Sequence, residues 1–216
     1  MRHIILVFLF LVRPLFASDI VLIDTGYSKN TFSNITIGPP AFTPIHHHGQ
    51  EMLTSLNNEL FIKKTQASTE MVSCEYRLPE KSCIVPLTYP IIKAVLLSPK
   101  IISISISGDI PDNTELIAIK LAQSLGILVI AASGNGGRGD TAYPAKYGGE
   151  CMLSVGTIIN SKIASYSKDA EVYIEQAGNE IGTSYSAARV AGRAWSYWSK
   201  HPRSTCKEVK EYLLGK

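Results

Sequence analysis

Three polar residues have the types and the order that activate a serine hydroxyl. Ser184 follows Gly182-Thr183 and begins an alanine-rich run typical of a helix, so its hydroxyl would lie at the partially positive helix N-terminus. Asp24 ends an apolar run, and His48 begins a second predicted helix. A serine is a useful nucleophile only when a base accepts its proton and a carboxylate orients that base. The chain order Asp, His, Ser is one of three in which this triad occurs.

Each residue also has a purely structural interpretation. Ser184 alone could be the N-cap of a buried helix, and Asp24-Thr25-Gly26 alone could be a turn. His48 is the last of three consecutive histidines, which could form a solvated loop or an adventitious metal site. Asn135 lies among glycines and could belong to a turn. The joint occurrence of these residues in this order favours catalysis.

The segments around these residues resemble the motifs of the subtilisin-like serine proteases (subtilases). Ile23-Asp24-Thr25-Gly26 is similar to the Asp motif of that family, and His48-Gly49 to the start of its His motif, HGTHVAG. Gly182-Thr183-Ser184 with Val190-Ala191-Gly192 is similar to its Ser motif, GTSMAAPHVAG. Ala131 to Asn135 resembles the segment that carries the oxyanion-hole Asn. Further matches are 102–108, 143–147 and 153–156.

The resemblance implies a serine endopeptidase that acts through an acyl-enzyme. Ser184 would be the nucleophile, His48 the general base and then the acid, and Asp24 the group that fixes the imidazole tautomer. Asn135 and the backbone N–H of Ser184 would stabilise the oxyanion. The substrate would be a peptide or protein in extended conformation, and no cofactor or catalytic metal is expected. The resemblance suggests calcium binding, but the sequence identifies no site for this ion.

The resemblance also indicates which residues contact the substrate. One segment is expected to pair with the substrate as an added strand, and a second to form one wall of the primary specificity pocket. The first comprises Ser103, Ser105, Ser107 and Gly108, and the second Ala132, Ser133 and Gly134. Small residues in the wall favour a sizeable apolar side chain before the scissile bond. If Asp140 pointed inward, Lys or Arg would be favoured instead.

Several positions depart from the family motifs. Gln50 and Glu51 replace a Thr and a second His, Ala188-Arg189 replaces Pro-His, and Ser107 stands where Gly is frequent. The predicted signal peptide also joins the first strand directly, without the long pro-segment of most subtilases. These departures motivate an alternative: a catalytically weak or inactive subtilase fold that binds extended peptides.

Residues 1–17 have the pattern of a secretory signal peptide. Arg2 precedes an unbroken apolar run of nine residues, 4–12, which is too short to span a bilayer, and Ala17 offers a small residue for cleavage. Residues 18–216 then form one catalytic domain of 199 residues. The net charge of the whole chain is +3. Such a balance of charges predicts binding neither to nucleic acid nor to an acidic partner. We expect a secreted monomer without a membrane anchor.

Four cysteines in an exported chain suggest disulfides. Cys74 and Cys83 flank a turn-like segment, which favours a local pair and leaves Cys151 to pair with Cys206. Buried free thiols are the alternative. Metal binding is not favoured, because no C-x-x-C spacing occurs.

Short apolar runs alternate with helical patterns along the chain, which favours parallel strands joined by crossover helices. The sequence therefore predicts a three-layer α/β/α sandwich with a mainly parallel central sheet, as the resemblance also implies. Strands are predicted at 20–24, 70–76, 101–106, 127–132, 151–156 and 171–177. Helices are predicted at 48–62, 89–97, 113–125, 183–199 and 204–214.

Overall fold

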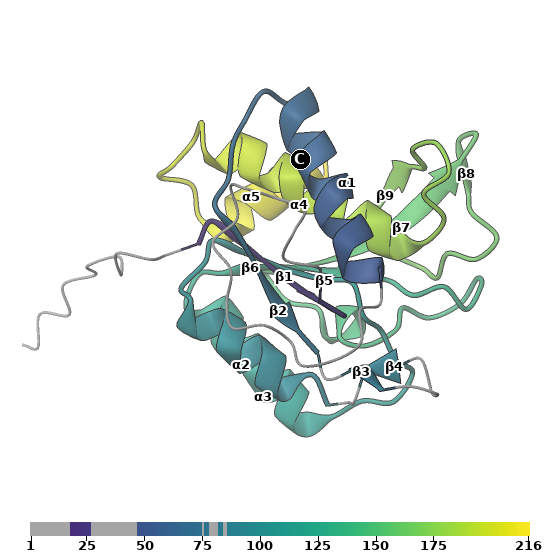
Figure 1. Cartoon of the computed structure of the whole chain (residues 1–216), viewed down its shortest axis with the longest axis horizontal. Coiled ribbons are helices and arrows are strands. Elements are labelled where there is room, and N and C mark those ends of the chain that lie inside the picture. Colours follow the sequence, from purple (N-terminus) through teal and green to yellow (C-terminus); the bar gives the residue numbers. More distant parts are fainter. Residues whose placement is uncertain (1–17, 27–46, 75, 78–81, 84–85) are drawn as a thin grey trace, which may run out of the picture.

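The computed structural model describes residues 18–26, 47–74, 76–77, 82–83 and 86–216 (Figure 1). The predicted signal peptide, 1–17, lies outside the described residues. Within the described part, a seven-stranded sheet has the order β2-β1-β5-β6-β7-β8, and β9 also pairs with β7. Its strands are β1 (Ile20–Asp24), β2 (Thr69–Ser73), β5 (Ile101–Ile104), β6 (Leu128–Ala132), β7 (Met152–Ile159), β8 (Lys162–Ile163) and β9 (Val172–Glu175). All pairs are parallel except β7 with β8.

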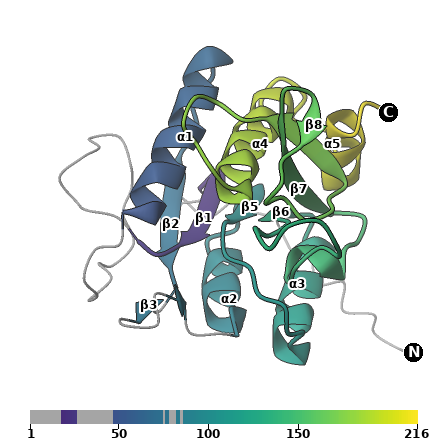
Figure 2. The same cartoon turned by 90° about the vertical axis from the view of Figure 1, so that its right-hand side faces the viewer.

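Helices cover both faces of the sheet, so the fold is the predicted α/β sandwich (Figure 2). One face carries α1 (His48–Ile62), α4 (Thr183–Trp198) and α5 (Cys206–Leu213). The other face carries α2 (Thr88–Leu96) and α3 (Asn113–Ser124). Asp112 caps the start of α3, because its carboxylate accepts the backbone N–H groups of Thr114 and Glu115. No helix in the described ranges is long and apolar enough to cross a bilayer.

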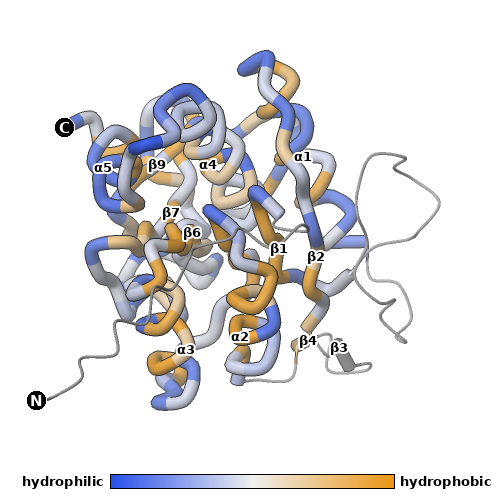
Figure 3. The backbone as a smooth tube through the Cα atoms, turned by 90° about the vertical axis from the view of Figure 1, so that its left-hand side faces the viewer, coloured by the Kyte–Doolittle hydropathy of each residue, from blue (hydrophilic) through white to orange (hydrophobic). Residues whose placement is uncertain are grey.

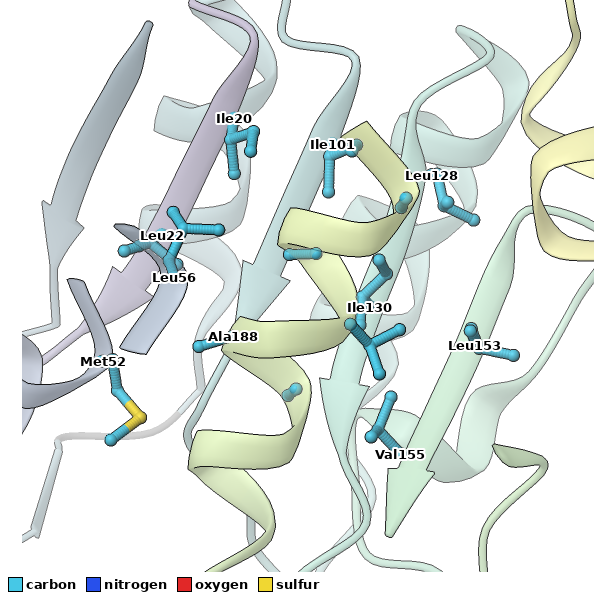
Figure 4. Close-up of a cluster of buried hydrophobic side chains, with 14 of the residues drawn as sticks. Ile20, Leu22, Met52, Leu56, Ile101, Leu128, Ile130, Leu153, Val155 and Ala188 are labelled. Carbon is cyan, nitrogen blue, oxygen red and sulfur yellow. The ribbon is translucent and has the colours of Figure 1, made fainter. Parts of the chain in front are cut away.

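Two hydrophobic clusters hold the three layers together. Alternate residues of each strand point to opposite faces, so Ile20 and Leu22 of β1 pack toward α1 and α4, whereas Val21 and Ile23 pack toward α2 and α3. Figure 4 shows the first cluster, in which Met52 and Leu56 of α1 and Ala188 of α4 lie near side chains of β1, β5, β6 and β7. Figure 3 shows strongly hydrophobic residues along β1. Burying each large aliphatic side chain stabilises the fold by about 1.5–3 kcal/mol.

All of the predicted helices and strands form, with shifted ends. Strand β5 ends at Ile104, two residues earlier than predicted; this is its last residue paired with the neighbouring strands, to Ile23 of β1 and Ala131 of β6. Four short elements were not predicted. They are the antiparallel pair β3 (Tyr76–Arg77) and β4 (Ser82–Cys83), the edge strand β8, and a 3₁₀ turn at Ala145–Tyr147.

Both predicted disulfides form in the structure. Cys74 is bonded to Cys83, which joins the end of β2 to the β3–β4 hairpin, and Cys151 is bonded to Cys206, which joins the start of β7 to the start of α5. The alternative of free thiols therefore does not apply.

Candidate active site

The fold brings the N-terminal turns of α1 and α4 to the carboxyl edge of the parallel sheet. Asp24 is the last residue of β1, His48 the first of α1 and Ser184 the second of α4. Gly49 allows the start of α1 to approach the end of β1 closely, since a Cβ there would clash with the carbonyl oxygen of Gly26. The backbone N–H of Gly49 also donates to Oγ1 of Thr25 at 3.1 Å. The start of α1 is thereby fixed against the end of β1.

Asp24 and His48 form a short hydrogen bond. Nδ1 of His48 lies 2.7 Å from Oδ1 of Asp24, whose carboxylate is fully buried. The same oxygen accepts the backbone N–H of Thr25 at 2.6 Å. When Nδ1 carries the proton and donates it to the carboxylate, Nε2 is the basic nitrogen of the ring. This is the arrangement that a general base requires.

Opposing effects set the basicity of His48. Burial lowers the pKa of the imidazole, but the hydrogen bond to Asp24 and the negative charges of Asp24 and Glu51 raise it, and the net pKa lies above its ordinary value. The pair of carboxylates therefore favours the imidazolium that a general base becomes after it accepts a proton.

Ser184 is nearly buried and is held by the segment that follows β5. Its hydroxyl donates to the carbonyl oxygen of Ser105 at 3.1 Å, and the hydroxyl of Ser105 donates to the carbonyl oxygen of Ser184 at 3.4 Å. Ser184 is 6% exposed. This reciprocal pair fixes the first turn of α4 against the candidate substrate-binding segment.

Asn135 follows β6 and is oriented by Thr183. Oδ1 of Asn135 accepts the backbone N–H of Thr183 at 2.9 Å and its hydroxyl at 3.0 Å. The amide nitrogen is then the group left to donate outward, and Asn135 is exposed. Gly182, next to Thr183, has φ +134, and a Cβ there would lie 3.5 Å from Nδ2 of Asn135. A glycine at 182 therefore provides the backbone conformation and leaves the amide accessible.

The structure changes the expected substrate-binding segment. Ser103 is fully buried, and its backbone pairs with Leu22 of β1 on one side and Ile130 of β6 on the other. It cannot pair with a substrate, so its assignment is wrong. Ser105 leaves the sheet beside Ser184, and the next exposed positions are Ser107 and Gly108.

The expected pocket wall is formed mainly by backbone. Ala132, Ser133 and Gly134 are buried, and the hydroxyl of Ser133 donates to the carbonyl oxygen of Lys168 at 3.1 Å. Asp140 does not point inward: it is 85% exposed and pairs with Lys146 at 2.7 Å. Asp140 therefore does not place a carboxylate inside the pocket, and it does not favour Lys or Arg before the scissile bond.

A pocket of about 250 Å³ is lined in part by the segment that follows β5. Its lining is mostly apolar and includes Leu87, Ile106, Pro111 and Tyr143, with Glu115 among the polar residues. Sequence reasoning missed this pocket. No group of three His, Cys, Asp or Glu side chains in the described ranges is arranged to hold a metal ion.

Three positions that depart from the family motifs have structural roles. Arg189 of α4 pairs through Nε with Glu59 of α1 at 3.3 Å and donates from Nη1 to the carbonyl oxygen of Glu175 at 2.7 Å. Ala188 is fully buried in the core. Glu51 accepts a hydrogen bond from Tyr185, the residue after Ser184. No local pattern in the sequence indicates this last contact, because its two residues are 134 positions apart.

Comparisons with known proteins agree with this arrangement. The model described as the subtilase family matches residues 88–216. The chain is 26% identical over 218 residues to Subtilisin Savinase of Lederbergia lenta, covering 90% of this chain and 81% of that protein. It is also 26% identical over 218 residues to an alkaline protease of Shouchella clausii, covering 90% of this chain and 57% of that protein.

Solved structures show the same fold. The prenylagaramide maturation protease PagA superposes with a TM-score of 0.69 at 23% identity, covering 91% of this chain and 82% of that one. Sphericase superposes with a TM-score of 0.65 at 17% identity, covering 92% and 83%.

Proposed function

The chain belongs to the subtilase family and is a serine-type endopeptidase, and we propose that Asp24, His48 and Ser184 are its catalytic triad. The observation that carries this proposal is the 2.7 Å hydrogen bond between buried Asp24 and His48. It lies at the same sheet edge as the helix start that bears Ser184.

In the proposed reaction, Nε2 of His48 accepts the proton of Ser184 while Oγ of Ser184 bonds to the scissile carbonyl carbon. The tetrahedral oxyanion accepts hydrogen bonds from the amide of Asn135 and the backbone N–H of Ser184. His48 then donates its proton to the leaving amine as the C–N bond breaks, which leaves an acyl-enzyme. A water molecule, deprotonated by His48, hydrolyses the ester and restores the serine.

For this reaction the hydroxyl of Ser184 must exchange its present acceptor for His48. Its hydrogen bond to the carbonyl oxygen of Ser105 is between neutral groups, and such a bond contributes only about 0.5–1.5 kcal/mol. Loss of this hydrogen bond is therefore a small part of the barrier.

A serine-directed fluorophosphonate tests the proposal without a known substrate. We expect covalent labelling of Ser184, identified by mass spectrometry of the labelled peptide. Absence of labelling in folded protein would favour the alternative of a non-catalytic protein that binds extended peptides. The observed roles of Ala188 and Arg189 in packing do not favour that alternative, because neither contact involves the triad.

We also propose that the protein is exported with removal of residues 1–17. The two disulfides suit an oxidising compartment. Sequencing the N-terminus of exported material should give Ser18 as the first residue, and a retained N-terminal segment would contradict the proposed cleavage.

A further inference from the structure

Lys168 lies where the primary specificity pocket is expected, and its aliphatic stem packs on a wall made of glycines. A Cβ built on Gly134 would lie 3.0 Å from Cδ of Lys168, and one built on Gly136 would lie 3.0 Å from its Cε. The backbone N–H of Lys168 donates to the carbonyl oxygen of Gly134 at 3.1 Å. Glycines on this wall therefore leave the space that the lysine stem fills.

The Lys168 side chain also connects the two segments that frame the pocket. Its ammonium pairs with Asp109 at 2.8 Å, and Asp109 directly follows Gly108 of the substrate-binding segment. Ala142 and Tyr143 form a common floor that joins these two segments. Gly108 exchanges backbone hydrogen bonds with Tyr143, and Ala142 donates to the carbonyl oxygen of Ser133. A Cβ on Gly134 would also lie 3.0 Å from Cβ of Ala142, so the lysine stem passes close to the floor.

The two partners of this ion pair are held very differently. The side chain of Lys168 is 19% exposed, whereas that of Asp109 is 79% exposed. An ion pair with so exposed a carboxylate contributes little, because water and salt compete for it. A substrate carboxylate can therefore replace Asp109 on the ammonium, while the packed stem keeps Lys168 in place. The reverse exchange, in which a substrate lysine displaces Lys168, would remove the stem from its packing on the glycines.

We propose that Lys168 determines the substrate specificity of this protease, and that the pocket accepts an acidic side chain before the scissile bond. The inference rests on the proposed function, since it assumes that Ser184 is the nucleophile beside this pocket. It replaces the apolar preference that the small wall residues alone suggested.

The test compares hydrolysis of blocked tetrapeptide p-nitroanilides that differ only in the residue before the anilide: Glu, Leu or Lys. We expect wild type to have its highest kcat/KM with Glu. Lys168→Met keeps most of the stem and removes the charge, so the Glu-to-Leu ratio of kcat/KM should fall by about ten- to a hundredfold, the range of a hydrogen bond to a charged group. Lys168→Glu should reverse the preference toward Lys.

Two further variants keep the test decisive. Asp109→Asn frees the ammonium without disturbing the stem, so the Glu-to-Leu ratio should rise. Lys146→Met is the matched control, because Lys146 pairs with exposed Asp140 instead, and the ratio should stay at the wild-type value.

Preferential hydrolysis of the Leu substrate by wild type, with a ratio unaffected by Lys168→Met and Asp109→Asn, would overturn the inference and leave the proposed function intact. If neither wild type nor Ser184→Ala hydrolyses any of the substrates and wild type is not labelled by fluorophosphonate, the proposed function is wrong, and the inference about Lys168 fails with it.

Discussion

The hydroxyl of Tyr185 donates a 2.6 Å hydrogen bond to Oε2 of Glu51. The bond joins the first turn of α4, next to Ser184, to the first turn of α1, next to His48. Both residues depart from the family motifs, which have Met and a second His at these positions. The contact thus holds the proposed nucleophile and base in a fixed relation, and it places a carboxylate close enough to raise the pKa of His48.

Replacing Glu51 by Gln should move the acidic limb of the pH–rate profile to lower pH. His48 acts as a base only when neutral, and the Glu51 charge raises its pKa, so loss of that charge lets His48 become neutral at lower pH. A shift of roughly 0.2–0.7 pH units corresponds to the about 0.2–1 kcal/mol of an exposed charge pair. The measurement is kcat/KM against pH. Tyr185→Phe removes the hydrogen bond but keeps the carboxylate and should not produce the downward shift; an unmoved limb in Glu51→Gln would show that Glu51 does not act on His48.

Replacing Ser184 by Ala should abolish peptide hydrolysis and fluorophosphonate labelling while leaving the fold intact. Single losses of the nucleophile or the base in subtilisin reduce turnover by about 10⁶, and we expect the same scale here. Ser199→Ala, at the exposed end of the same helix, is the matched control and should retain activity. Equal casein hydrolysis by wild type and Ser184→Ala would refute the assignment.

Replacing Asn135 by Ala should lower kcat by about 10²–10³, the cost of removing one oxyanion donor in subtilisin, with a much smaller change in KM. The reason is that the amide would bind the charge that develops only in the transition state. Asn58→Ala, at an exposed position of α1, serves as the control. A purely structural role for Asn135 would instead appear as a lower melting temperature with little change in kcat.

Removing the disulfide between Cys151 and Cys206 should destabilise the protein more than removing that between Cys74 and Cys83. Their sequence separations are 55 and 9 residues, and loop-closure entropy gives roughly 4 and 2.5 kcal/mol respectively. Urea unfolding of the two double Cys→Ser variants checks the order. Mass spectrometry of non-reduced peptides should recover both pairs, and mixed pairings would contradict the connectivity.

The sequence alone determined the main helices and strands and the identity of the triad candidates. Runs such as 20–23 and 128–132 are apolar throughout because parallel strands between helices are buried on both faces, so they can be identified locally. The motif residues around Asp24, His48 and Ser184 are equally local, because each lies within a few positions of the glycine that lets the backbone turn or approach there.

Only the tertiary structure decided which of these residues face a substrate. Ser103 looked equivalent to Ser105, but pairing with strands on both sides buries the first and leaves the second beside Ser184. Asp140 and Lys168 are both charged residues on loops, yet the first is directed to solvent and the second lies against Gly134. Side-chain direction on a loop depends on contacts between segments distant in sequence, and no local pattern encodes them.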